Sequence, residues 1–122
     1  MGLRVLHVLD HSAPLHSGYA FRTLNILSEQ RRLGWETLHL TSPKQGASPS
    51  LKDEVDGWVF HRTPNDGQAG LVRQMQLTAA RLAQVVQAEQ PDLIHAHSPV
   101  LNALPALWVG RRHRVPVVYE MR

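Results

Sequence analysis

A glycine-bearing turn between a predicted strand and a predicted helix is the first stretch that could bind a ligand. The segment DHSAPLHSGYAFRTL (residues 10–24) follows the apolar run LRVLHVL, and Gly18 stands at the predicted start of the helix. The first backbone N–H groups of a helix attract anions, and glycine allows a phosphate to approach the backbone closely. Ser17 could cap the helix, with His16 as a polar neighbour. The same residues could equally form only the turn. The absence of GxGxxG and GK[ST] disfavours a dinucleotide site and a P-loop.

Two further stretches place polar side chains two residues apart near strand ends. His95 and His97 in DLIHAH would share one face of a strand. The pair could bind a metal ion, but no third ligand is evident, so no metal site is expected. His97, at the end of the strand, could donate a hydrogen bond to a sugar or phosphate, or support the neighbouring loop. Glu120 and Arg122 in VVYEMR could orient a polyol or form a structural ion pair.

The elements that would position these residues follow from hydrophobic periodicity and turn residues. Strands are predicted at residues 3–9, 35–42, 58–62, 92–97 and 115–121, and helices at 18–33, 71–89 and 99–112. An exposed loop rich in Pro, Gly and Ser is predicted at 43–57. This alternation is typical of an α/β fold, a Rossmann-like three-layer sandwich with a mainly parallel sheet in the order 3-2-1-4-5. Ligands bind such sheets where the strand order reverses, here between the first and fourth predicted strands.

The other histidines are given structural positions, and the composition excludes several classes of function. His7 and His39 are predicted to pack in the core, and His61 and His113 to be exposed. The chain has 122 residues, which suits one domain, and no cysteine, which excludes disulfides and thiolate metal sites. The formal net charge is +3, but the basic residues are dispersed, so nucleic-acid binding is not predicted. The basic group at 111–114 could favour an anionic lipid surface.

Three stretches together resemble one enzyme family. RVLHVLDHSAPLHSGYAFRTLNILSEQRRLGWETLHLT (4–41) is similar to the opening of the retaining, nucleotide-sugar-dependent glycosyltransferases of family four. Its turn Gly34-Trp35-Glu36 corresponds to a Gly-His-Glu-like turn of the family. QPDLIHAHSP (90–99) is similar to the family's Pro-Asp-hydrophobic-hydrophobic-His-Ala-His segment, and RVPVVYEMR (114–122) resembles its fifth strand. The stretches cover most of the chain in the family's order and spacing.

The resemblance implies a GT-B fold, in which two Rossmann-like domains face each other across a cleft. Residues 1–122 would be most of the N-terminal, acceptor-side domain, in truncated form, and the donor-binding C-terminal domain would be absent from this chain. We expect the chain to be inactive alone. The reaction implied is transfer of a sugar from a nucleotide-sugar donor to a glycan or lipid-linked acceptor, without metal or other cofactor. The Glu-x-Arg ending resembles bacterial exopolysaccharide enzymes. The implied location is the cytoplasm, peripheral to the inner membrane.

The resemblance also assigns residues to roles. Glu120 stands where the family usually has threonine, and Arg122 where it often has a histidine near the donor sugar; both are assigned as catalytic. The family's Gly-Gly pair in the first loop is replaced here by Ser17-Gly18. The implied donor-binding residues are His16, Ser17, Gly18 and His97.

An alternative of a different class is a stand-alone flavodoxin-like module that binds a nucleotide or flavin, or that acts in signalling. A signalling receiver domain would need an acidic cluster near the end of the first strand, where only Asp10 is present. A flavin site would need an aromatic-flanked Ser/Thr loop, for which Tyr19 and Phe21 are the candidates.

Overall fold

The computed structural model describes residues 2–9, 18–42, 52–55, 57–63, 70–97 and 100–120. They form a single six-stranded sheet in the order β3-β4-β2-β1-β5-β6 with three helices. The strands are β1 (Arg4–Leu9), β2 (Glu36–Thr41), β3 (Lys52–Val55), β4 (Trp58–Arg62), β5 (Leu93–His97) and β6 (Val117–Glu120). The helices are α1 (Gly18–Arg32), α2 (Leu71–Glu89) and α3 (Val100–His113).

The sheet confirms the predicted topology and adds one strand. In sequence order the predicted strands correspond to β1, β2, β4, β5 and β6, and their spatial order is the predicted 3-2-1-4-5 with parallel pairing throughout. The prediction of a loop over 43–57 was wrong for β3, which pairs antiparallel with β4. The segment KDEV has no apolar run to reveal a strand, and it is ordered by a tight hairpin through Gly57, whose φ is +82°.

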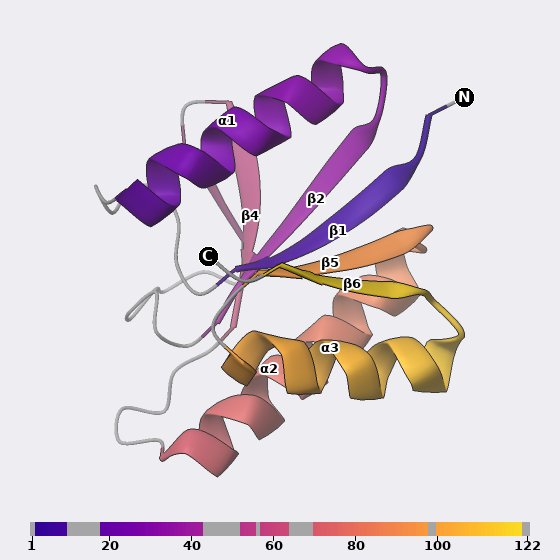
Figure 1. Ribbon diagram of the computed structural model, residues 1–122. Coiled ribbons are helices and arrows are strands. Elements are labelled where there is room, and N and C mark those ends of the chain that lie inside the picture. Colours follow the sequence, from indigo (N-terminus) through magenta and orange to yellow (C-terminus); the bar gives the residue numbers. More distant parts are fainter. Residues whose placement is uncertain are drawn as a thin grey trace.

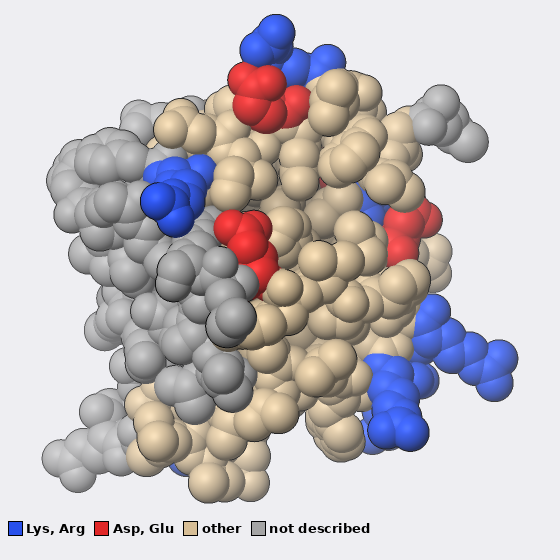
Figure 2. Space-filling model, in the orientation of Figure 1, with Lys and Arg blue, Asp and Glu red and all other residues tan. Residues whose placement is uncertain are grey.

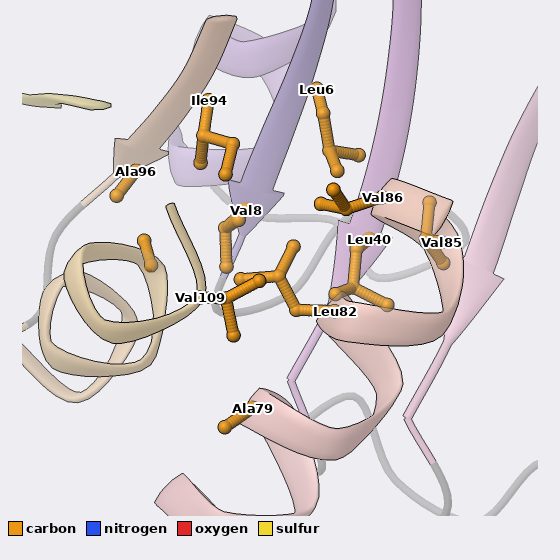
Figure 3. Close-up of a cluster of buried hydrophobic side chains, with 11 residues drawn as sticks. Leu6, Val8, Leu40, Ala79, Leu82, Val85, Val86, Ile94, Ala96 and Val109 are labelled. Carbon is orange, nitrogen blue, oxygen red and sulfur yellow. The ribbon is translucent and has the colours of Figure 1, made fainter. Parts of the chain in front are cut away.

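Helices cover both faces of the sheet, with α1 on one side and α2 and α3 on the other (Figure 1). Because side chains alternate along a strand, Leu6 and Val8 of β1 point to the α2/α3 side, whereas His7 points to the α1 side. The apolar core lies on the α2/α3 side (Figure 3). Its fully buried members include Leu6, Val8, Leu40, Leu82, Ile94 and Ala96.

The helix ends follow the sequence signals. Gly34 follows α1 with φ +88°, as predicted for a C-terminal glycine, and its N–H donates to the carbonyl of Arg31. Pro105 lies inside α3, beyond the first turn, and is buried. Among the described residues, no helix combines the length and the apolar character that crossing a bilayer requires.

Candidate functional site

The strand order reverses between β1 and β5, as predicted. The chain leaves β1 toward β2 on one side and leaves β5 toward β6 on the other, so the carboxyl ends of β1 and β5 adjoin the expected ligand crevice. Gly18 begins α1, as predicted. His16, Ser17 and Arg122 lie outside the described residues.

A cluster of three histidines, His7, His95 and His97, lies on the α1 side of these two strands. His7 and His95 are register partners in the parallel pair β1–β5. His7 Nδ1 and His97 Nε2 share a hydrogen bond of 2.8 Å, and the rings of His95 and His97 stack with centroids 4.3 Å apart. The amide oxygen of Gln30 in α1 accepts a hydrogen bond from His7 Nε2 at 2.7 Å. This histidine cluster therefore joins α1 to the two central strands.

Glu120, at the end of β6, adds a carboxylate to the histidine cluster. Its Oε1 lies 2.9 Å from His95 Nε2 and 3.9 Å from His97 Nδ1. The side chains of His95 and Glu120 are 15% and 32% exposed, whereas His97 is fully buried. The result is a carboxylate at the carboxyl edge of the sheet that is partly open to solvent and oriented by the partly buried imidazole of His95.

His97 makes contacts that correspond to one of the two roles that the sequence allowed, the support of neighbouring structure. Its side chain contacts His7, and its backbone carbonyl accepts a hydrogen bond of 2.8 Å from the Asn102 side-chain amide in α3. Both contacts fix the end of β5, which favours the supporting role for this residue in the described structure.

The third member of the histidine cluster, His7, was not predicted as a site residue from the sequence. His7 is buried in the core, as predicted, but it also lies beside the His95/His97 pair, for which no third partner was evident. A signal did exist. The predicted order places the strands of RVLHVL and DLIHAH next to each other, and each carries a histidine near its middle.

A second buried histidine, His39 in β2, lies on the same side of the sheet. Its Nδ1–H donates to the carbonyl of Val59 at 2.7 Å, and its Nε2 lies 2.9 Å from the hydroxyl of Thr37. That hydroxyl also accepts a hydrogen bond of 3.0 Å from Arg31 Nε. Burial lowers the pKa of His39 to about 4, and the nearby Arg31 cation contributes in the same direction. His39 is therefore neutral at physiological pH.

The prediction that His61 and His113 are exposed was wrong. His61 is buried because β4 is not at the sheet edge but lies between β3 and β2. Burial lowers its pKa, and the Arg81 cation adds to this effect. His113 is half-buried because it ends α3 beside the groove between α2 and α3.

That groove, of about 730 Å³, is lined mainly by apolar side chains of α2 and α3, including Met75, Ala79, Leu104 and Trp108. Leu104 and Trp108 are 50% and 59% exposed. Arg112 also lines it, with its guanidinium carbon 5.8 Å from the centre of the Trp108 ring. Figure 2 shows Lys and Arg side chains projecting from the molecule at the end where α3 terminates.

Comparison with known proteins identifies the family. Residues 17–122 match the family described as glycosyl transferase 4-like domain. The chain belongs to this family. The resemblance seen in the sequence is therefore confirmed, and the flavodoxin-like alternative is disfavoured.

This glycosyl transferase 4-like domain is also similar to a longer curated protein. It is 25% identical over 118 residues to the GDP-mannose-dependent alpha-mannosyltransferase of Mycobacterium tuberculosis (strain CDC 1551 / Oshkosh). The alignment covers 96% of this chain and 31% of the relative. The chain thus spans about a third of the relative's length.

Solved structures share the fold of the domain. UDP-GlcNAc 2-epimerase from Neisseria meningitidis, bound to UDP-GlcNAc, superposes with a TM-score of 0.66 at 12% identity over 96% of this chain and 31% of that one. The glycotransferase of kitacinnamycin superposes with a TM-score of 0.56 at 14% identity, over 98% of this chain and 30% of that one. These likenesses confirm the Rossmann-like architecture that the sequence predicted.

Proposed function

We propose that the chain is the N-terminal, acceptor-side half of a retaining glycosyltransferase that moves a sugar from a nucleotide-sugar donor to a glycan or lipid-linked acceptor. The family match over residues 17–122 is the observation that carries this proposal. Because the chain spans 31% of the mannosyltransferase, we infer that a C-terminal domain completes the donor site. The isolated chain would then be inactive.

The nucleotide-sugar donor is supported by the printed ligands of the similar proteins. One relative is GDP-mannose-dependent, and one structural neighbour is bound to UDP-GlcNAc. In the proposed site, Gly18 at the start of α1 approaches the donor diphosphate together with His16 and Ser17. Stabilisation of the leaving diphosphate by backbone N–H and basic groups supplies the electrostatic catalysis, and the proposed transfer step uses no metal or other cofactor.

Glu120 and Arg122 are proposed to face the reacting sugar from the end of β6. The position of Glu120 supports this role, since the carboxylate is partly exposed and held at 2.9 Å by His95. A carboxylate fixed in this way can accept hydrogen bonds from sugar hydroxyls or from the acceptor hydroxyl. His97, fully buried, acts beneath it as a support.

The proposed test measures transfer by the complete enzyme from a panel of nucleotide sugars, with the anomeric configuration of the product determined by NMR. Retention is expected. Glu120→Gln is expected to lower kcat by about a hundredfold or more, within the range for a positioned polar catalyst. Glu36→Gln, on the amino-terminal edge of the sheet, is the matched control. Transfer at a normal rate by residues 1–122 alone, or inversion of configuration, would contradict the proposal.

We further propose that the enzyme works in the cytoplasm on an exopolysaccharide pathway and touches the membrane peripherally, with no role for nucleic acid. The membrane contact is supported by the exposed surface of α3, where Leu104, Leu107 and Trp108 are each at least half exposed and Arg111 and Arg112 follow. Apolar and aromatic side chains beside arginines suit an anionic bilayer surface. In a sedimentation assay, the protein is expected to bind vesicles that contain anionic lipid, and the Trp108→Ser variant is expected to bind them more weakly. Equal binding to neutral vesicles would contradict the proposed membrane contact.

A further inference from the structure

We propose that the histidine cluster is a binding site for a divalent transition-metal ion, with His7, His95 and His97 as ligands. Each of these residues offers one nitrogen, and the three nitrogens all lie within 4.8 Å of one another. Three imidazoles are a sufficient protein ligand set for zinc, which takes a water molecule or a carboxylate as its fourth ligand. The inference concerns ion binding and does not depend on the transferase activity.

The backbone of the sheet places the three imidazoles together. His95 and His97 are two residues apart on β5 and so share a face, and His7 stands opposite His95 on the neighbouring parallel strand. Strands β1 and β5 are interior strands, paired on both sides. The site is therefore built on interior strands of the sheet, which limits the conformational entropy lost when an ion binds.

Outer partners already contact two of the rings. Gln30 Oε1 accepts from His7 Nε2, so a neutral His7 carries its lone pair on Nδ1, the atom that faces His97. Glu120 Oε1 lies 2.9 Å from His95 Nε2. Carbonyl or carboxylate acceptors on the second ring nitrogen are the usual partners of metal-bound histidines, because they fix the tautomer and raise the basicity of the ligand.

Side-chain movements and a change of tautomer at His97 separate the described arrangement from a coordinated one, because His97 Nε2 now donates its proton to His7 Nδ1. His7 Nδ1 and His97 Nε2 are 2.8 Å apart, whereas two nitrogens about 2.05 Å from a tetrahedral ion are roughly 3.3 Å apart. The parallel stack of His95 and His97, with 5° between the ring planes, must also tilt so that both lone pairs converge. A neutral His97 that binds through Nε2 carries its proton on Nδ1, which lies 3.9 Å from Glu120.

The donor set selects the class of ion. Neutral imidazoles favour Zn²⁺, Co²⁺, Ni²⁺ and Cu²⁺, whereas Mg²⁺ and Ca²⁺ prefer oxygen ligands. His7 and His97 are fully buried, so the ion would lie beneath the carboxyl edge of the sheet and would stabilise the junction of β1, β5 and α1. This is a structural role, distinct from the transfer step proposed above.

The test uses the chain without an oligohistidine tag, stripped of metal with a chelator. Titration with Zn²⁺ by calorimetry is expected to give one site per chain, and Co²⁺ is expected to give the visible absorption of a tetrahedral ion. A hundredfold excess of Zn²⁺ over its Kd is expected to raise Tm by about 10 °C, while the same concentration of Mg²⁺ leaves it unchanged.

A matched pair of variants locates the ion. His95→Gln removes the most exposed ligand and is expected to weaken binding at least tenfold, whereas His113→Gln, at the end of α3, is expected to leave it unchanged. If His95→Gln does not fold, NMR of the wild-type imidazole nitrogens provides the same answer, with shifts on Zn²⁺ addition confined to the three cluster residues. Failure of the wild type to bind one ion, or loss of binding in His113→Gln alone, would overturn the proposal and identify the cluster as a hydrogen-bonded unit only. No nucleotide sugar is present, so either result leaves the transferase proposal standing.

Discussion

Acidification is expected to destabilise the domain through His39. The neutral side chain satisfies all its hydrogen bonds: Nδ1–H donates to Val59 O, and Nε2 accepts from the Thr37 hydroxyl, which itself accepts from Arg31. Protonation at Nε2 would remove the acceptor of the hydrogen bond from the Thr37 hydroxyl and place a cation close to the Arg31 guanidinium. That guanidinium lies 4.1 Å from the centre of the Trp58 ring. The side chain is 1% exposed, so water cannot solvate the new charge.

The magnitude follows from the shift in pKa. Burial lowers the pKa of His39 from 6.5 to about 4, so the folded state binds fewer protons than the unfolded state between these values. The contribution to stability is fully present above pH 6.5 and is lost as the pH falls toward 4. Linkage gives a loss of about 2 kcal/mol at pH 5 and about 3 kcal/mol at the acid limit.

The assay compares the free energy of unfolding in urea at pH 8 and pH 5 for the wild type and for His39→Gln. The wild type is expected to lose about 2 kcal/mol more than the variant over this range, since glutamine cannot be protonated and all other groups titrate in both proteins. His113→Gln is the control and should retain the wild-type difference. Equal losses in the wild type and in His39→Gln would refute the reasoning, as would an NMR titration midpoint of His39 near 6.5.

Two further predictions concern packing and charge. Gly110→Ala is expected to lower the free energy of unfolding by about 1–3 kcal/mol, because the new Cβ would lie 2.5 Å from Val117 Cγ2. In the control Gly70→Ala, the new Cβ meets nothing within 4 Å, so this variant should unfold at nearly the wild-type urea midpoint. Asp53→Asn is expected to cost about 1–3 kcal/mol, because it removes the carboxylate 2.9 Å from Nε of Arg62, whose side chain is only 3% exposed; an unchanged Tm would contradict this.

The sequence predicted the interior strands and helices because their signals are local. The segment WVFHR predicted β4 with the observed bounds, and the apolar stripe of residues 71–89 predicted α2 with the observed bounds. The hairpin strand β3 could not be predicted in this way. Its four residues are mainly charged, and they form a strand only because β4 offers a free edge and Arg62 offers a partner for Asp53.

Site residues could be predicted where their position depends on a single strand, but contacts between residues of two strands could not. His97 and Glu120 were found because each ends a predicted strand. The link between Glu120 and His95 and the position of His7 depend on pairing registers, which single-strand periodicity does not encode. The exposure of His61 was mispredicted for a related reason, since the strand that pairs with the outer edge of β4 was not predicted.

The two faces of the sheet show where packing alone cannot explain the sequence. The α2/α3 side is filled with aliphatic side chains, which suffice to hold the layers together. On the α1 side the same central strands present His7, His39 and His97, all buried, and such polar groups stabilise a fold less than aliphatic ones even when they are hydrogen-bonded. His39 bonds to β4, whereas His7 and His97 bond to each other, and His97 lies 3.9 Å from the carboxylate of Glu120 at the crevice. The buried imidazoles on this face are therefore better explained by the site that they support than by the stability of the domain.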